Sequence, residues 1–198
     1  MFDSLSSALE DLRRGKMIIV VDSEDRENEG DLIMAAEHCR PEDINFMITH
    51  ARGLVCTPMD HHRAMKLSLP LMVRKNEESS HCRFTVSCDL KLGTTTGISA
   101  TDRSKTVRAL ADDLSVEQDF VSPGHIFPII ADPGGIAARQ GHTEATIELM
   151  KLANLKPVGV ICEMIRADGD MMHRDDLVEF KKQYNLKLIT IDAIIDAL

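Results

Sequence analysis

An acidic segment near the start of the chain has the composition of a cation site. From Asp22 to Asp31 the sequence reads Asp-Ser-Glu-Asp-Arg-Glu-Asn-Glu-Gly-Asp, which places six carboxylates beside a single arginine. Neighbouring carboxylates repel one another unless a cation or a proton offsets their charge, and magnesium and manganese prefer oxygen ligands. The segment therefore indicates either a divalent-cation site or a solvated acidic loop.

The flanking sequence favours the cation site. The segment follows a predicted buried strand, contains the helix-breaking Gly30 and leads directly into the apolar residues from Leu32 onward, so both of its ends are fixed. Its order of acids and glycine does not match the EF-hand calcium loop. Asp22 and Glu29 are candidate acids or bases for proton transfer.

A second cluster has the features of an anion site. Residues 139–144 read Arg-Gln-Gly-His-Thr-Glu and precede the clearest predicted helix, for which Thr143 is the expected cap. The free N–H groups and the dipole at a helix start favour a phosphate, and Arg139 adds positive charge. His142 could ligate a metal or donate a hydrogen bond. The alternative is an ordinary helix start with an incidental histidine.

Two isolated polar residues stand at predicted strand edges. His125 lies between Gly124 and Ile126, and Glu163 follows an apolar run. Each residue type can serve as a general acid or base. Each also has a structural alternative, namely a hydrogen-bonded histidine and a solvated glutamate.

The elements that must position these residues alternate between strands and helices. Because regular βαβ spacing is broken in the middle of the chain, we predict a single α+β domain over residues 1–198 with a mixed β-sheet packed with helices. The Pro123-Gly124-His125 stretch is expected to interrupt the chain before a strand. Apolar spacing predicts strands over 17–21, 32–36, 53–57, 84–88, 126–130, 158–164 and 186–191, and helices over 4–14, from 41, over 101–111, after 143, over 174–183 and at the C-terminus.

Two further segments stand out between these elements. Residues 73–82 lack an apolar period and predict an exposed loop, which is either a lid or solvent-exposed filler. Residues 93–97 read Gly-Thr-Thr-Thr-Gly and predict a turn too rich in hydroxyls for ordinary core.

Composition excludes several classes of function. The net charge of −9 over 198 residues argues against nucleic acid and anionic membranes, because both require a basic surface. Five cysteines without a C-x-x-C pair indicate neither a disulfide framework nor a zinc knuckle. The N-terminus lacks signal-peptide features, and no apolar run is long enough to span a bilayer. We therefore expect a cytoplasmic protein.

With these residues assembled, the sequence resembles the 3,4-dihydroxy-2-butanone 4-phosphate synthase family of riboflavin biosynthesis across essentially its whole length. Five separate blocks in the right order carry the resemblance. They are residues 24–32 (Glu-Asp-Arg-Glu-Asn-Glu-Gly-Asp-Leu), residues 93–100 (Gly-Thr-Thr-Thr-Gly-Ile-Ser-Ala) with Asp102-Arg103, Pro123-Gly124-His125, residues 141–145 (Gly-His-Thr-Glu-Ala), and residues 159–163 (Gly-Val-Ile-Cys-Glu).

The resemblance implies a lyase that converts D-ribulose 5-phosphate to 3,4-dihydroxy-2-butanone 4-phosphate and formate, through a metal-stabilised enediolate and a skeletal rearrangement. It implies Mg²⁺ or Mn²⁺ as cofactor, an α/β sandwich, and a homodimer whose active site lies near the subunit interface. His125 and Glu163 would be needed for catalysis, and Glu27 and His142 would hold the metal. The implied substrate contacts are Arg26, Glu27, Asp31, Arg139, Gln140, Gly141, His142, Thr143 and Glu163.

Two residues depart from the family pattern, and other functions stay open. Ser23 stands where the family usually has a second aspartate, and Cys82 where threonine is common. The chain ends at Leu198, so we expect no fused GTP cyclohydrolase II domain. The alternative functions are another metal-dependent sugar-phosphate isomerase or aldolase, or a nucleotide- or RNA-binding module.

Overall fold

A mixed sheet of seven strands in the order β4-β5-β3-β6-β2-β1-β7 runs through the computed structural model, which describes residues 2–198. The pairs β1–β7 and β3–β5 are parallel, and the other neighbours are antiparallel. The strands are β1 (Ile18–Val21), β2 (Gly30–Ala35), β3 (Arg52–Met59), β4 (Cys88–Leu90), β5 (Phe120–Ile130), β6 (Gly159–Met164) and β7 (Leu188–Thr190).

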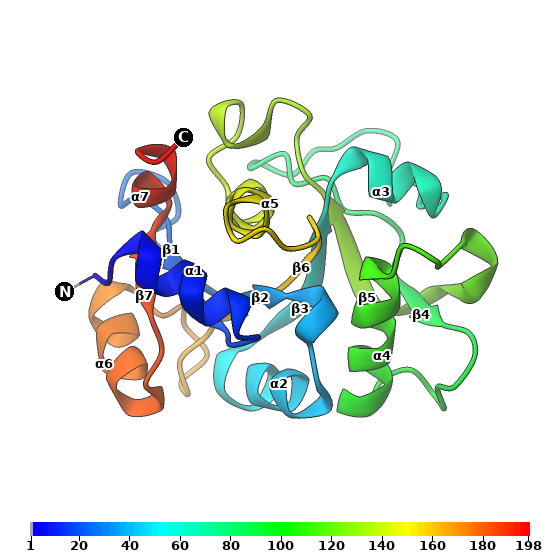
Figure 1. Ribbon diagram of the computed structural model, residues 1–198, viewed down its shortest axis with the longest axis horizontal. Helices are drawn as coiled ribbons and strands as arrows, with labels where there is room; N and C mark the ends of the chain where they lie inside the picture. The colour runs from blue at the N-terminus through cyan, green and yellow to red at the C-terminus, as the bar shows by residue number, and fades with distance from the viewer. Residues whose placement is uncertain (1) are drawn as a thin grey trace.

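Helices cover both faces of the sheet (Figure 1). One face carries α1 (Leu5–Arg13), α5 (His142–Leu152) and α7 (Ile191–Ile195), and the other carries α2 (Pro41–Phe46), α4 (Ala100–Ala111) and α6 (Arg174–Tyr184). Helix α3 (His61–Lys66) follows β3. The short helical turns are η1 (Ala36–His38), η2 (Met47–Ala51), η3 (Glu117–Asp119) and η4 (Gly135–Ala137).

The apolar strands divide their side chains between two cores. In β1, Ile18 and Val20 pack beneath α1 and α5, whereas Ile19 and Val21 pack in the core beneath α2 and α6. Successive side chains of a strand point to opposite faces, so a strand covered on both sides reads as a continuous apolar run. Full burial of each such side chain contributes about 1.5–3 kcal/mol of transfer free energy. The predicted α+β architecture with a mixed sheet is confirmed.

Two strand predictions were wrong in position. The predicted strand over 84–88 is instead β4 at Cys88–Leu90, and Phe84 makes only an isolated bridge. Pro123-Gly124-His125 does not precede the strand but lies inside β5. The reason is a register shift: Cys88 pairs with Ile126, whereas the next residue, Asp89, pairs with Val121. The residues between these partners form a bulge, where a proline disrupts no regular ladder.

Two helix starts also differ from the prediction. Helix α5 begins at His142 with Gly141 as its N-cap, so Thr143 lies within the first turn instead of capping it. Helix α4 is capped by Ser99, whose hydroxyl accepts the Asp102 N–H at 3.0 Å. Glycine and serine are both favoured N-caps, and each stands two positions before the residue at which the helix was predicted to be capped or to begin.

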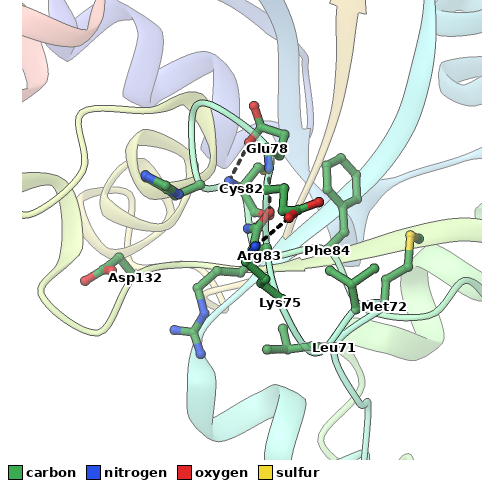
Figure 2. Close-up of a pocket in the computed structure, with 12 residues that line it drawn as sticks. Leu71, Met72, Lys75, Glu78, Cys82, Arg83, Phe84 and Asp132 are labelled. Atoms are coloured by element: carbon green, nitrogen blue, oxygen red, sulfur yellow. Dashed lines mark hydrogen bonds and ion pairs between the residues drawn. The ribbon is translucent and has the colours of Figure 1, made fainter.

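The loop over residues 73–82 is folded around one carboxylate. Glu78 accepts the backbone N–H groups of Ser80 at 2.7 Å and Cys82 at 2.8 Å. Burial acts to raise the pKa of Glu78, but these hydrogen bonds outweigh it and lower the pKa to about 2. An open cavity of about 540 Å³ lies on one side of the loop, bordered by Leu71, Met72 and Phe84 (Figure 2). Glu78 and Cys82 also line a second pocket, of about 430 Å³.

No helix within residues 2–198 is long and apolar enough to cross a membrane. The five cysteines are all unpaired, and four of them are buried.

Candidate active site

Three adjacent strands each bring a carboxylate to the same face of the sheet. Asp31 in β2 pairs with Val20 in β1 and with Glu163 in β6, and residues paired across a ladder share a face. Asp22 follows Val20 by two residues and therefore continues on that side. Elsewhere these strands present apolar residues such as Ile33 to the core beneath α5. At the strand ends beside the start of α5, these positions are occupied by acidic residues instead of apolar ones.

Asp31 and Glu163 border a pocket of about 430 Å³ between the sheet, the start of α5 and the loop around Glu78. Apolar side chains from β5 and β6 contribute to its wall, and charged groups dominate the rest. The lining residues are Arg26, Glu27, Glu29, Asp31, Glu78, Ser80, Cys82, Phe84, Ile129, Arg139, His142, Thr143, Ile161 and Glu163. Most of the site residues implied by the resemblance therefore meet in one place.

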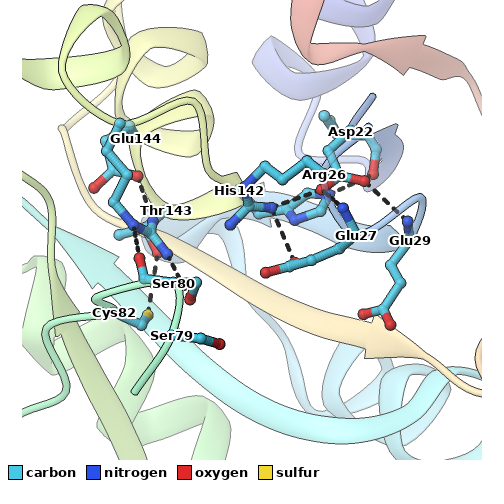
Figure 3. Close-up of polar contacts among 12 residues, drawn as sticks. Asp22, Arg26, Glu27, Glu29, Ser79, Ser80, Cys82, His142, Thr143 and Glu144 are labelled. Carbon is cyan, nitrogen blue, oxygen red and sulfur yellow. Dashed lines mark hydrogen bonds and ion pairs between the residues drawn. The ribbon is translucent and has the colours of Figure 1, made fainter. Parts of the chain in front are cut away.

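Asp22 organises the acidic loop (Figure 3). Its carboxylate is 1% exposed and accepts the Glu29 N–H at 2.9 Å and the Glu27 N–H at 3.2 Å. The Arg26 guanidinium lies 2.6 Å from Asp22 Oδ2 and 2.9 Å from Glu27 Oε2 through the same nitrogen, Nη1. The Arg26 guanidinium thus bridges the two carboxylates. Their repulsion is offset by positive charge at this position, which is where a bound cation would be stabilised.

The donor atoms beside this bridge fit a hard divalent cation. Asp22, Glu27 and His142 each offer a ligand atom, and these atoms lie within 4.8 Å of one another. Nε2 of His142 is 3.2 Å from the Val20 carbonyl, which can only accept, so Nε2 carries the proton and Nδ1 keeps the lone pair. Burial lowers the pKa of His142 and favours the neutral, ligating form. Asp22 is an addition to the pair implied by the resemblance.

Three carboxyl groups that line the pocket hold protons more tightly than usual. Burial raises the pKa of Asp31 well above its ordinary value, and the charge of Glu163 adds to the effect. Burial likewise raises the pKa of Glu163, and burial followed by the charge of Glu27 raises that of Glu29. Raised pKa values bring carboxyl groups closer to the range in which they act as both acids and bases.

A bulge in β3 positions Glu163. The pairing of β3 with β6 shifts between Arg52 and Val55, which turns the Leu54 N–H toward Glu163 Oε2 at 2.7 Å. Gly53 allows this close approach, because a Cβ there would lie 2.3 Å from the Glu163 carbonyl oxygen. This contact was not predicted from the sequence. The glycine within the predicted strand was the available signal, since glycines inside strands often mark bulges.

Arg139 is held by a buried partner that was also not predicted from the sequence. Its Nη1 lies 2.6 Å from Glu144 Oε2, and its Nε donates to the Ser80 carbonyl at 2.8 Å. Glu144 is 2% exposed, and its other oxygen accepts the Asp132 N–H at 2.9 Å. The sequence signal for this ion pair was Glu144, an acid in the first turn of the predicted helix that closely follows Arg139. Gln140, by contrast, is exposed and is not among the residues that line the pocket.

The start of α5 faces the pocket. Its N-cap is Gly141, which has no side chain to accept the first backbone N–H groups of the helix, and both His142 and Thr143 line the pocket. The Thr143 hydroxyl lies 4.0 Å from the Cys82 thiol of the loop. This helix start, with Arg139 across from it, is a suitable place for an anion.

His125 stands apart from this group. Its imidazole is 41% exposed, lies 2.7 Å from the Asp89 carboxylate, and is not among the residues that line the pocket. Within one chain, the structure therefore brings together all of the predicted catalytic acids but not the predicted catalytic histidine.

The comparison with known families agrees with the residues in the pocket. A model of the 3,4-dihydroxy-2-butanone 4-phosphate synthase family matches residues 6–197. The chain belongs to this family.

Relatives in this family match nearly the whole chain. It is 53% identical over 193 residues to the 3,4-dihydroxy-2-butanone 4-phosphate synthase of Pseudomonas aeruginosa, covering 98% of this chain and 53% of the relative. It is 51% identical over 196 residues to the riboflavin biosynthesis protein RibBA of Endomicrobium trichonymphae, covering 99% of this chain and 49% of the relative. The chain thus spans about half the length of these curated relatives.

Solved structures of the family have the same fold. A crystal structure of a 3,4-dihydroxy-2-butanone 4-phosphate synthase in complex with two magnesium ions matches with a TM-score of 0.96 at 39% identity, covering 99% of this chain and 96% of the other. The Candida albicans synthase matches with a TM-score of 0.92 at 46% identity, covering 100% and 98%.

The acidic pocket of this family member should cost folding stability, and Asp31→Asn should recover part of it. Burial raises the pKa of Asp31 in the folded state. The contribution of Asp31 to the free energy of unfolding is therefore most favourable below the pKa that Asp31 has in the unfolded chain, and it is lost as pH rises through the pKa in the folded state. In chelator at pH 8, Asp31→Asn should raise the free energy of unfolding by roughly 1–3 kcal/mol. The gain should shrink toward about pH 4, near the unfolded value.

Urea unfolding at both pH values measures this effect. The matched control is Asp25→Asn, which neutralises an exposed acid of the same loop and should leave stability unchanged. A loss of stability in Asp31→Asn at pH 8 would contradict the proposed electrostatic strain.

Proposed function

We propose that this chain converts D-ribulose 5-phosphate to 3,4-dihydroxy-2-butanone 4-phosphate and formate, the family reaction of riboflavin biosynthesis. The observation that carries the proposal is the pocket of about 430 Å³, which joins an oxygen-rich cation site to an anion site. A sugar phosphate needs both, because its phosphate and its hydroxyl and carbonyl oxygens lie at opposite ends of a short chain.

The phosphate is bound at the start of α5. Arg139 contributes a charge-assisted hydrogen bond, the Thr143 hydroxyl adds another, and the open N–H groups of the first turn complete the site. Glu144 fixes the guanidinium from behind, at 2.6 Å. A fixed guanidinium loses little side-chain entropy when the anion binds, which favours affinity.

Glu27 and His142 hold a magnesium or manganese ion, and Asp22 lies close enough to join them. The two magnesium ions in a family structure support this assignment. When bound, the cation stabilises negative charge on adjacent substrate oxygens. Arg26 leaves its position between Asp22 and Glu27 and contacts the substrate instead.

The buried carboxyl groups transfer the protons. Glu163 has a raised pKa and is fixed by the hydrogen bond from Leu54, and it transfers protons to and from the sugar carbons. Asp31 lies beside it, paired across the β2–β6 ladder. Glu29 lines the pocket, and its N–H donates to the buried Asp22 beside the cation site. Positioned acids and bases contribute about 10²- to 10⁴-fold each to such steps.

A second copy of the chain supplies His125. The imidazole is exposed and outside the pocket of its own chain, and apolar side chains of residues 92–98, whose Gly97 approaches it, are also exposed, including Leu92 at 78% and Ile98 at 51%. Such apolar exposure is typical of an interface. In a homodimer this surface lies against the other copy's pocket, and each site combines the acids of one chain with the histidine of the other.

Formate release tests the proposed function. Incubation of the purified chain with ribulose 5-phosphate and magnesium should produce formate, observed by NMR, in an amount equal to the four-carbon phosphate. Chelation by EDTA should abolish formate, and magnesium or manganese should restore it. An isomerase or aldolase with the same two sites would consume the sugar without formate. Absence of formate from folded, metal-loaded protein refutes the proposal.

A further inference from the structure

Asp89 is bound to His125 through both of its oxygens. Oδ1 accepts the backbone N–H of His125 at 2.8 Å, and Oδ2 lies 2.7 Å from the imidazole Nδ1. Asp89 is 7% exposed, whereas the His125 ring is 41% exposed. The bulge between β4 and β5 creates this arrangement, because Asp89 is the residue at which the register shifts. A buried carboxylate thus holds the inner edge of a ring whose outer edge is accessible.

We infer that Asp89 is a positioning residue for the reaction: it fixes the ring of His125 and its tautomer, with the proton on Nδ1 and the lone pair on the outward Nε2. An ionised carboxylate has only acceptor atoms, so Nδ1 must donate. The accessible Nε2 can then accept a proton from a substrate group. This is the general arrangement in which a buried acid orients a histidine base.

The hydroxyl-rich turn over residues 93–97 covers this bond. A Cβ on Gly97 would lie 2.0 Å from Asp89 Oδ2 and 2.7 Å from His125 Nδ1, and Gly97 has a φ of +90°. Only glycine both lacks the Cβ that would clash here and readily adopts this positive φ. A lower local dielectric strengthens the hydrogen bond that the turn covers.

A second buried acid fixes that turn. Asp102 is 2% exposed, and its Oδ2 accepts the Thr95 hydroxyl at 2.7 Å, the Thr95 N–H at 3.1 Å and the Gly97 N–H at 3.2 Å. The Gly-Thr-Thr-Thr-Gly block and the acid of the following helix therefore act together. Their combined effect is to place Gly97 over the Asp89–His125 pair, which gives this block a role that the pocket itself does not explain.

The role of Asp89 in turnover rests on the proposed function, since it requires that His125 take part in that reaction. The tautomer of His125 does not rest on it and can be observed directly. The test therefore uses the variant Asp89→Asn with two readouts. Asparagine keeps an oxygen to accept the His125 N–H, but its amide turns a donor toward Nδ1. The ring proton should then move to Nε2.

The first readout is the ring spectrum of the full chain labelled with ¹⁵N-histidine, with His125 assigned by its loss in His125→Ala. Wild type should show Nδ1–H, and Asp89→Asn should show Nε2–H. In the second readout, kcat of Asp89→Asn should fall by about 10²- to 10⁴-fold. KM should stay within about threefold, because the substrate's binding contacts are intact. The control Asp168→Asn changes an exposed carboxylate that also accepts a backbone N–H, at 3.2 Å, and should alter neither readout.

Two outcomes overturn the inference. One is Nε2–H at His125 in wild type, which can be read even if Asp89→Asn does not fold. The other is a folded Asp89→Asn with kcat within about threefold of wild type while His125→Ala is inactive. If formate is never produced but the tautomer changes as described, the proposed reaction fails and the structural part of the inference stands.

Discussion

Glu27→Gln should lose turnover by about 10²- to 10³-fold while still binding ribulose 5-phosphate, because it removes one charge from the cation site and leaves the phosphate site intact. Glutamine can still accept the hydrogen bond that Arg26 now donates to Glu27 at 2.9 Å, so the loop should keep its fold. Steady-state kinetics at saturating magnesium, with circular dichroism as a check of folding, separates the two effects.

A neighbouring acid provides the matched control. Glu24→Gln also removes one negative charge from the loop, but this side chain is 66% exposed and pairs with Arg174 at 3.2 Å, outside the pocket. It should keep nearly full activity. A folded Glu27→Gln with the kcat of wild type would remove Glu27 from the mechanism.

Glu27→Gln also tests whether two chains share each site. Mixed in equal amounts with His125→Ala, itself expected to be inactive, it should recover about a quarter of wild-type activity, because half of the dimers are hybrids and each hybrid keeps one intact site. If both residues act within one chain, every site in the mixture carries a defect and activity stays absent. Exchange of subunits is verified by mass spectrometry of differently labelled chains.

Arg139→Ala should raise KM by about ten- to a hundredfold, since a charge-assisted hydrogen bond to phosphate contributes roughly 1.5–3 kcal/mol. The structure adds a second effect. Glu144 is 2% exposed and would lose its cationic partner, and an unpaired buried charge typically costs about 3–5 kcal/mol of folding stability. The single variant should therefore be both weakly binding and unstable.

The double variant Arg139→Ala with Glu144→Gln separates these effects. Glutamine can still accept the Asp132 N–H, which Glu144 now accepts at 2.9 Å, but it carries no charge. The double variant should regain most of the lost stability, measured by urea unfolding, and keep the raised KM. A normal KM in the folded double variant would place the phosphate elsewhere. Equal stability of the single and double variants would show that the ion pair contributes little.

The residues of the candidate site could be predicted from the sequence where they are close along the chain. The acidic loop lies within ten consecutive positions and the Arg139–Thr143 stretch within five, so their composition and their place after a strand or before a helix were visible. Hydrophobic periodicity also predicted most of the strands and helices. Asp31 and Glu163 were found separately, but their pairing depends on β2 lying beside β6, which no local pattern specifies.

The missed contacts are those formed by irregular backbone between distant segments. Leu54 and Glu163 are 109 positions apart, and their hydrogen bond depends on a bulge that changes register by only a few residues. Asp89 and His125 are 36 positions apart and meet at another bulge. Bulges leave little trace in hydrophobic periodicity, because they interrupt the alternation on which the prediction depends.

The guanidinium of Arg26 is a counterion within the acidic loop itself. It therefore affects the order in which a cation and an anion can bind. At 2.6 Å from Asp22 and 2.9 Å from Glu27, it competes with any metal for the same oxygens. Metal affinity is therefore lowered by whatever free energy that ion pair contributes. Once displaced, the arginine remains attached beside the pocket and is free to attract an anion. On the proposed function, the loop would therefore favour an order in which the cation binds first and the anionic substrate second.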